Sequence, residues 1–279
     1  MPMNFAKTAM LLAMLTAIFV AMGAVVGGRE GMVIAFVIAV GTNAFAFWNS
    51  DTVVLKMFNT QPVMQADAPR LHDLVATLAT RAGLPMPKVY LLNTPQPNAF
   101  ATGRNPSNSA VAVSSGLLDT LSWEELAGVI AHELAHIKNR DMLISTIAAG
   151  IGGAISYLPF LLMAGGRDDE DGGHPLTGFA VAILGQAAAM ILQFAISRQR
   201  EFEADRVGAE ILGQPMPLAN ALKRLDRMSQ QIPMRVAPAA APLAQVNPLA
   251  AGGGRMLKLF STHPPTEERV AKLLAIRAR

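Results

Sequence analysis

Cysteine is absent from this chain of 279 residues, and charged side chains are scarce. Without cysteine there is neither a disulfide framework nor a thiolate metal site, so any bound metal must be held by His, Asp or Glu. Charged residues make up 15% of the sequence and hydrophobic residues make up 52%. This balance is unusual for a soluble domain and favours a membrane protein.

Long basic runs are also absent, although the chain has 23 Lys and Arg residues against 20 Asp and Glu residues. Surfaces that bind nucleic acids typically cluster basic residues on one face or along one segment. Aromatic residues make up only 6% of this sequence and are not interleaved with basic ones. We therefore expect no nucleic-acid partner.

Four long apolar runs contain no charged residue. They cover residues 8–28, 31–48, 143–166 and 175–197. Each run is close to the length of about 20 residues that a helix needs to cross a bilayer. The first run could be a cleaved signal peptide, but it is longer than the apolar core of such a peptide and a second run follows at once. We expect four transmembrane helices in two hairpins, with the lipid bilayer as their partner.

The distribution of Lys and Arg orients these helices. Only Arg29 and Arg167, of the 23 basic residues, fall in the short loops within the two hairpins. Because Lys and Arg near span ends are retained on the cytoplasmic side, both termini and both polar regions are expected in the cytoplasm.

The polar regions predict a mainly α-helical fold with a small β-sheet. An amphipathic pattern predicts a helix over residues 71–82, and a second is expected over residues 266–278. Ser122 and Glu125 form a capping box, which predicts a helix that runs to at least Lys138. Short strands are expected at residues 88–92, 98–102 and 109–113.

The capped helix carries the sequence His132-Glu133-Leu134-Ala135-His136. Residues four apart lie on the same face of a helix, so both imidazoles can reach one metal ion. Glu133 is placed to deprotonate an attacking water, which is what peptide hydrolysis at neutral pH requires of a general base. The pattern also arises by chance in a small fraction of chains, and His-rich helix faces without metal exist.

Zinc in a catalytic site needs a third protein ligand, which here must be His, Asp or Glu. His136 lies about seven residues before the third apolar run, and Glu201 follows shortly after the fourth run. Because a short loop makes these two helices antiparallel, both residues are expected at a similar depth at the membrane surface. Glu201 and Asp205 share a helix face, whereas Glu203 points away from it. We therefore expect Glu201 to be the third ligand.

Two carboxylates near the predicted ligands have alternative interpretations. Asp205 is placed to accept a hydrogen bond from the distal N–H of a ligand histidine, or it is an ordinary exposed helix carboxylate. Asp141, like Asn139, could orient the metal-binding helix, but a plain C-terminal cap explains both residues equally well.

Three segments of the chain resemble the HtpX family of bacterial membrane metalloproteases. They read HELAH at residues 132–136, EFEAD at residues 201–205 and STHPP at residues 261–265. The resemblance extends over nearly the whole chain, and the family is related to the eukaryotic zinc proteases that process prenylated CaaX proteins. It implies a gluzincin-type site, with one zinc ion held by two His and one Glu, in a zincin-like cytoplasmic protease domain.

The resemblance further implies an ATP-independent endopeptidase of the bacterial inner membrane. Its polypeptide substrates would be misfolded or surplus membrane proteins, cut on their cytoplasmic parts in quality control and the stress response.

The resemblance also implies two further sites. His263 and Arg269 match residues near the scissile carbonyl, where His263 could donate to the developing oxyanion; a helix-start turn with a surface arginine is the plain alternative. The segment that matches the family's substrate-binding edge strand comprises Asn98, Ala99, Phe100 and Ala101.

These features divide the chain into four parts. They are an N-terminal membrane hairpin (1–50), the first part of the protease domain (51–142), a second membrane hairpin (143–197) and the second part of the protease domain (198–279). The sequence predicts no oligomeric state.

Two other functions compete with proteolysis. One is a metal-binding membrane scaffold without proteolytic activity, which the presence of Glu133 disfavours. The other is a channel or transporter, which the lack of ionisable residues within the apolar runs disfavours.

Overall fold

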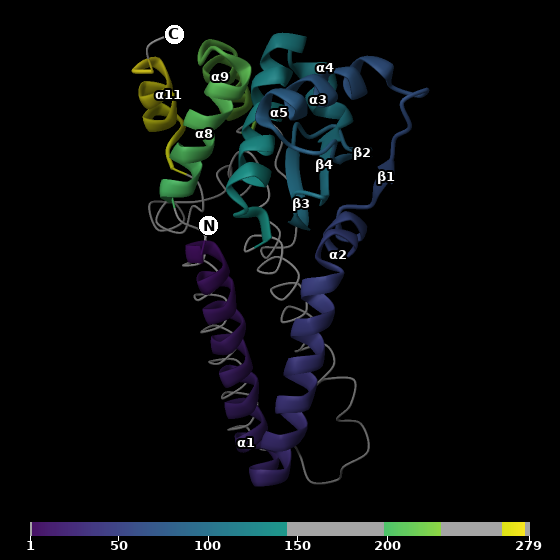
Figure 1. Ribbon diagram of the computed structural model, residues 1–279, viewed down its shortest axis with the longest axis vertical. Coiled ribbons are helices and arrows are strands. Elements are labelled where there is room, and N and C mark those ends of the chain that lie inside the picture. Colours follow the sequence, from purple (N-terminus) through teal and green to yellow (C-terminus); the bar gives the residue numbers. More distant parts are fainter. Residues whose placement is uncertain (1, 144–197, 230–263, 277–279) are drawn as a thin grey trace.

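The computed structural model describes residues 2–143, 198–229 and 264–276. In chain order the elements are α1 (Pro2–Trp48), α2 (Ser50–Met57), β1 (Thr60–Pro62), α3 (Pro69–Ala82), β2 (Lys88–Leu92), β3 (Ala99–Asn105), β4 (Asn108–Ser114), α4 (Ser115–Thr120), α5 (Trp123–Asn139), α8 (Arg198–Leu212), α9 (Met216–Ser229) and α11 (Thr266–Leu274). The described part is mainly helical with one small mixed sheet, as the sequence predicts (Figure 1). The expected third and fourth membrane spans lie almost entirely outside the described residues.

Helix α1 is a hairpin of two antiparallel halves. Its backbone leaves the helical conformation near Gly28, whose φ of 56° is a left-handed value that glycine adopts without a side-chain penalty. The side-chain amide of Asn43 donates to the hydroxyl of Thr16 at 2.9 Å, which joins the two halves. The stretch Thr8–Val25 is long and apolar enough to cross a membrane, and it is the one helix of this kind among the described residues. Residues 31–48, expected as the second span, form the other half of the hairpin.

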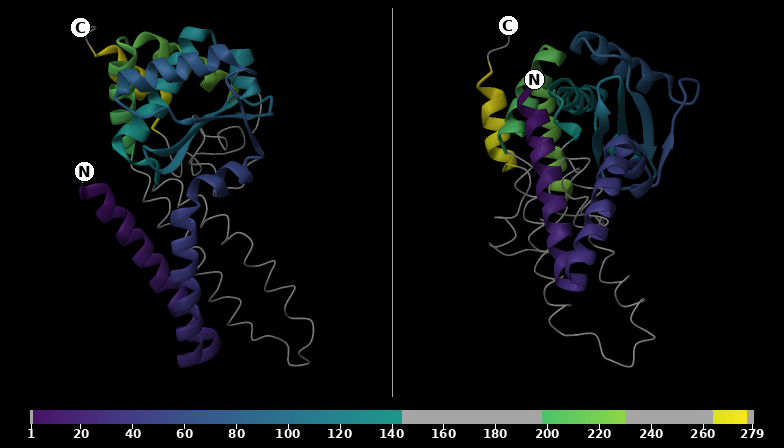
Figure 2. Two further views of the ribbon diagram at one scale, coloured as in Figure 1. Left: turned by 45° about the vertical axis from the view of Figure 1, so that its right-hand side comes forward. Right: turned by 60° about the horizontal axis from the view of Figure 1, so that its bottom comes forward.

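Both halves of α1 extend away from the sheet and the remaining helices (Figure 2). Large apolar side chains are exposed along the second half. They are Met32, Val33, Ile34, Phe36, Val37, Ile38, Val40, Phe45 and Trp48. An outward apolar surface of this extent is typical of a helix that contacts lipid or other apolar helices.

The sheet has four strands in the order β1-β2-β4-β3. Strands β2 and β4 are parallel, whereas the pairs β1–β2 and β3–β4 are antiparallel. Among the described strands, β3 is therefore an edge strand. Strand β2 has the predicted bounds, β4 is one residue longer at each end than predicted, and β3 begins one residue later and ends three residues later.

Alternate residues of the strands point to opposite faces of the sheet. On one face, Ala101 and Val111 belong to the main hydrophobic core, together with residues of α3 and α5. On the other face, Phe100 and Ala112 pack against Leu55 of α2. The sheet is thus covered by α5 on the side of the main core and by α2 on the other side.

Helix α5 begins at the capping box that the sequence predicts. The Glu125 N–H donates to the Ser122 hydroxyl at 3.2 Å, and the Ser122 N–H donates to the Glu125 carboxylate at 2.9 Å. Two N–H groups that have no partner within the helix are satisfied in this way.

Two glycines allow neighbouring helices to approach α5 closely. A Cβ at Gly128 would lie 2.6 Å from the backbone nitrogen of Leu218 in α9. A Cβ at Gly208 of α8 would lie 3.0 Å from the Cα of His132. Both distances are too short for a larger side chain, so these glycines determine how near α8 and α9 lie to α5.

Some elements differ from the sequence prediction. Strand β1 and helices α2, α4 and α9 were not predicted, because they are short or lack a distinctive start signal. Helix α11 ends at Leu274, before the predicted end at residue 278.

Candidate metal centre

Two histidines of α5 and one glutamate of α8 form a compact cluster. The Nε2 atoms of His132 and His136 lie 3.1 Å apart. The Glu201 carboxylate lies 3.7 Å from the first of these atoms and 3.6 Å from the second. One ligand atom from each residue lies within 4.8 Å of the others, so the three residues could hold one metal ion.

The close crossing of α5 and α8 brings these residues together. His132 and His136 are one turn apart on α5, so their rings project from the same face. Gly208 follows Glu201 by seven residues, or about two turns, so Glu201 is carried by the side of α8 that packs on α5. The contact at Gly208 therefore holds Glu201 beside the histidines.

Each histidine has a carboxylate on its other ring nitrogen. Nδ1 of His132 lies 2.9 Å from Asp205, and Nδ1 of His136 lies 3.0 Å from Asp141. An ionised carboxylate only accepts hydrogen bonds, so each neutral ring carries its proton on Nδ1 and leaves a lone pair on Nε2. Two lone pairs that face each other at 3.1 Å repel unless a cation lies between them. Two imidazole nitrogens and a carboxylate oxygen are a donor set of catalytic zinc sites, so the residues fit that ion.

Carboxylates dominate the electrostatics around His136. Burial lowers the pKa of His136, but the nearby carboxylates of Asp141, Glu201 and Glu133 outweigh this effect and raise it to about 10. The cluster therefore favours positive charge at this position, either as a proton or as a metal cation.

Asp205 forms a buried ion pair with Arg269 of α11. The guanidinium donates to the two carboxylate oxygens at 2.8 Å and 2.6 Å, and both side chains are about 2% exposed. Burial raises the pKa of the Asp205 carboxyl, but the charge and hydrogen bonds of Arg269 lower it to about 2. The carboxylate thus stays ionised beside His132, and it is not the exposed helix carboxylate of the plain alternative.

Arg269 lies on the Nδ1 side of His132. Its Nη2 is 3.4 Å from that nitrogen, and its Nη1 is 3.8 Å from the Glu201 carboxylate. It is not a surface arginine, and these contacts favour a role through Asp205 over the expected role beside the scissile carbonyl. The pairing with Asp205 was not predicted, because no local pattern in the sequence signals a contact between residues 64 positions apart.

The contacts of Asp141 separate its two interpretations. Its side chain is 3% exposed and meets the ring of His136, while its backbone N–H donates to the His136 carbonyl at 3.3 Å. The backbone of Asp141 therefore forms a hydrogen bond at the C-terminus of α5, and its carboxylate contacts the His136 ring.

Replacing Asp141 with asparagine is expected to weaken zinc binding by about 10- to 100-fold. The neutral amide can donate to Nδ1 of His136, and the ring then carries its proton on Nε2 and cannot bind metal through that atom. The dissociation constant is measured by competition with a chromogenic chelator. Asp119→Asn, at an exposed position of α4, is the matched control. Equal affinity in the Asp141 variant and the wild type would contradict the role of this carboxylate.

Glu133 follows His132 on α5 and is 4% exposed. Its charge is one of those that raise the pKa of His136, so the carboxylate lies near that ring. Glu133 lies beside the three-residue metal cluster and is not part of it.

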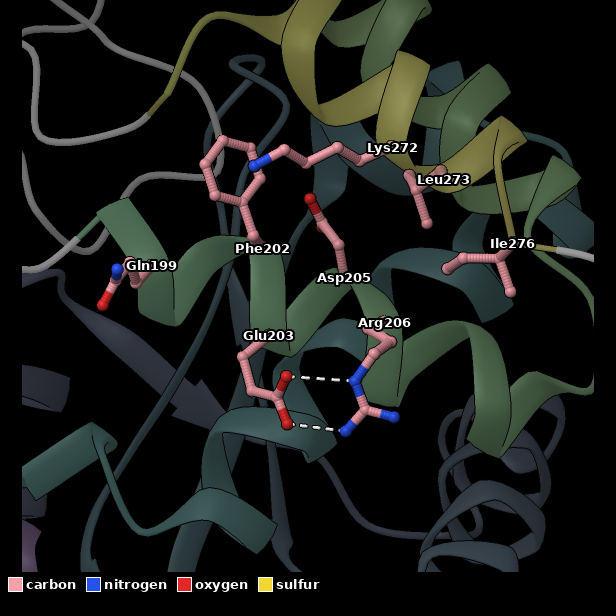
Figure 3. Close-up of a pocket in the computed structure, with 8 residues that line it drawn as sticks. All are labelled: Gln199, Phe202, Glu203, Asp205, Arg206, Lys272, Leu273 and Ile276. Carbon is pink, nitrogen blue, oxygen red and sulfur yellow. Dashed lines mark hydrogen bonds and ion pairs between the residues drawn. The ribbon is translucent and has the colours of Figure 1, made fainter.

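Figure 3 shows that neighbouring residues of α8 point to different sides of the helix. Phe202 and Asp205 face α11, where the Lys272 amino group lies 3.2 Å from the centre of the Phe202 ring. Glu203 lies on the other side and pairs with Arg206 at 2.6 Å and 3.0 Å. A pocket of about 340 Å³ lies between α8 and α11. Glu203 is thus turned away from the metal cluster, as helical periodicity predicts.

The remaining predicted site residues are His263 and the segment 98–101. His263 lies outside the described residues. Asn98 precedes β3, and Ala99, Phe100 and Ala101 lie within it, all with buried side chains. Substrate could therefore contact this segment only through the backbone, on the side of β3 that meets no other described strand.

Comparison with known proteins extends these observations. Residues 65–277 match the model of peptidase family M48. A protease HtpX homolog of Gemmatimonas aurantiaca is 54% identical over 279 residues, which cover 99% of this chain and 100% of that protein. A protease HtpX homolog of Methylibium petroleiphilum is 54% identical over 278 residues, which cover 98% of each protein.

The fold is similar to the crystal structure of S. mikatae Ste24p, with a TM-score of 0.56 and 18% sequence identity. The match covers 98% of this chain and 63% of the Ste24p chain, and at this identity it concerns the fold alone. The segment that matches the family model contains the whole metal cluster and Glu133. The chain therefore belongs to peptidase family M48 and is a metalloendopeptidase.

Proposed function

We propose that this chain is a zinc-dependent endopeptidase of the bacterial inner membrane. It cuts misfolded or surplus membrane proteins on their cytoplasmic side, in quality control and the stress response. The observation that carries the proposal is the pair of facing Nε2 atoms of His132 and His136 beside Glu201, each ring held through Nδ1 by a buried carboxylate.

In this proposal His132, His136 and Glu201 bind one zinc ion, which when bound supplies Lewis-acid activation of water and of the substrate carbonyl. Glu133 accepts the proton of the attacking water and passes it to the leaving amine. Its burial beside the cluster keeps bulk water from competing for that proton.

Other residues position this machinery. Asp205 and Asp141 hold the two imidazoles in the tautomer whose Nε2 is free. Arg269 keeps Asp205 ionised and partly balances the charge of Glu201. His263 is proposed to donate to the developing oxyanion.

We further propose four transmembrane helices, with both termini and the active site in the cytoplasm. The protease domain is then formed by residues 51–142 and 198–279 around the hairpin 143–197, and residues 1–50 form the N-terminal hairpin. Support comes from the four uncharged runs, from the basic residues outside the short loops and from the apolar stretch Thr8–Val25.

Polypeptide substrates are proposed to pair with the side of β3 that meets no other described strand, along the segment 98–101. Pairing of this kind reads the backbone rather than side chains, which suits an enzyme that acts on unfolded segments of many sequences. Adjacent packing of β3 and α5 in the main core supports this placement, because it puts the edge strand beside the helix that carries Glu133.

Metal removal tests the proposed function. Detergent-purified full-length protein is expected to cut casein when loaded with zinc, to lose this activity on treatment with 1,10-phenanthroline and to regain it when zinc is restored. Metal analysis accompanies each step. Activity that persists after the metal is gone would overturn the proposal, and a zinc-bound protein without any activity would favour the membrane scaffold.

A further inference from the structure

Arg104, near the end of the edge strand β3, is bonded to the end of the α1 hairpin. Its Nη1 donates to the backbone carbonyl of Trp48 at 2.8 Å, and its Nη2 contacts the side-chain oxygen of Asn108 at 3.3 Å. Trp48 is the last residue of α1 and is exposed at the end of its apolar surface. Tryptophan at such a position is typical of the membrane–water interface.

The backbone before Arg104 is adapted to this contact. Gly103 has a φ of 135°, and a Cβ at this position would collide with the backbone oxygen of Asn108. The pairing of β3 with β4 shifts by a bulge between Gly103 and Asn105. Bulges of this kind bend a strand and redirect a side chain, here that of Arg104.

A second contact attaches the same strand to the membrane hairpin. Phe100 of β3 is 2% exposed, and its ring centre lies 4.7 Å from that of Phe58, which ends α2. Val54 and Leu55 of α2 belong to the same apolar cluster. Only Asn49 separates α2 from α1, so β3 contacts the end of the hairpin directly through Arg104 and the helix that follows the hairpin through Phe100.

These attachments set the height of the edge strand above the membrane. Ala99 lies five residues before Arg104, so at about 3.3 Å per residue the strand reaches about 17 Å from the level of Trp48. The metal cluster is at a comparable level. His136 lies seven residues before the third apolar run, and α5 ends at Asn139, so these residues span between about 10 Å, the helical length, and about 23 Å, the extended length.

We propose that this attached edge strand makes the enzyme select peptide bonds by their distance from the membrane. Bonds about three to six residues beyond the end of a substrate's own transmembrane helix reach the metal cluster best, because an extended chain of that length spans about 10–20 Å. Peptide bonds nearer to the substrate's transmembrane helix cannot reach the metal cluster. Peptide bonds farther from it are present at a lower local concentration around the metal cluster. The inference rests on the proposed function and adds the property by which membrane substrates are chosen.

The test uses full-length enzyme in liposomes with substrates that share one transmembrane helix. Each substrate carries the same segment derived from casein, with a single cleavage site at its first peptide bond, joined to the helix by 2, 6, 12 or 24 residues of Gly and Ser. The 6-residue linker is expected to give the fastest cleavage. The 24-residue linker is expected to be about eightfold slower, because the local concentration of a flexible segment falls with roughly the 3/2 power of its length. The 2-residue linker is expected to be cut poorly, because the segment cannot reach the site.

Two variants test the part played by Arg104. Arg104→Ala is expected to lower the ratio of cleavage between the 6- and 24-residue linkers by at least about twofold, since the strand is no longer held at one height. This ratio is insensitive to any general loss of activity. Arg81→Ala is the matched control, because exposed Arg81 likewise donates to a backbone carbonyl, that of Leu212, but far from the membrane hairpin.

Soluble casein separates this inference from the proposed function. Cleavage of soluble casein together with equal rates for all four linkers would overturn selection by distance and leave the protease intact. An unchanged ratio in Arg104→Ala would overturn the role of that residue. If neither casein nor any linked substrate is cut by the zinc-loaded enzyme, the proposed function and this inference both fall.

Discussion

Replacing Glu133 with glutamine is expected to lower the rate of casein cleavage by about 10²- to 10⁴-fold, the usual contribution of a general base. Glutamine has nearly the same size and fits the same buried position on α5, but its amide cannot accept a proton from water. The three side chains of the metal cluster are unchanged, because Glu133 is not among them. The expected result is therefore a protein that is folded and loaded with zinc but inactive.

The measurement compares wild type and variant at equal zinc content, which is determined on the same samples. Glu124→Gln is the matched control, because Glu124 is exposed in the first turn of the same helix. It is expected to cleave casein at the wild-type rate. Equal activity in the Glu133 variant and the wild type would show that Glu133 is not the base, or that the activity comes from a contaminating protease.

Replacing Arg269 with methionine is expected to destabilise the protein by about 3–5 kcal/mol, the usual cost of removing one partner of a buried ion pair. The Asp205 carboxylate would remain about 2% exposed beside His132, without the two hydrogen bonds that Arg269 now donates. Methionine fills a similar volume, so the effect reports the loss of charge and hydrogen bonds more than the loss of packing.

Thermal unfolding in detergent, followed by circular dichroism, measures this effect as a lower Tm. For a protein of this size 3–5 kcal/mol corresponds to about 10 °C. Arg206→Met is the matched control, because Arg206 pairs with Glu203 on the exposed side of α8 and such surface pairs contribute at most about 1 kcal/mol. A Tm for Arg269→Met equal to that of Arg206→Met would show that the buried pair does not stabilise the fold.

The two variants also distinguish the roles assigned to the two residues. The Glu133 variant is expected to change the rate and not the stability, because a neutral isostere replaces a base that the fold does not need. The Arg269 variant is expected to change both, since loss of the ion pair leaves His132 less well held. An Arg269 variant with normal stability and no activity would favour the role beside the scissile carbonyl that the sequence led us to expect.

Local sequence patterns predicted the parts of the fold in which a short segment determines its own conformation. The capping box at Ser122 placed the start of α5, because both of its hydrogen bonds join residues three apart. The short apolar segment KVYLL between turn-rich Asn, Pro and Gly segments placed β2 with its observed bounds. Short elements such as α2 and α4 were not predictable in this way, because packing against the sheet, rather than a repeating pattern, stabilises them.

The metal cluster was predictable because its geometry follows from helical periodicity and chain topology. His132 and His136 are four residues apart, and the antiparallel hairpin expected over residues 143–197 was predicted to bring Glu201 to their level. The partners of the two imidazoles were less clear. Asp205 and Asp141 each had a plain alternative, since a carboxylate near a helix end is as often exposed or a cap as it is a partner of histidine.

The sequence by itself determined the helix that carries His132 and His136 and the apolar runs, because each depends on residues close together in the chain, and the order of the apolar runs led to Glu201 as the predicted third ligand. Only the tertiary structure decided which distant side chains meet at the site. The pairing of Asp205 with Arg269 and the bond from Arg104 to Trp48 join residues 64 and 56 positions apart. Such contacts depend on how α11 packs against α8, and α2 against the sheet, and this packing is a property of the whole apolar core rather than of any local segment.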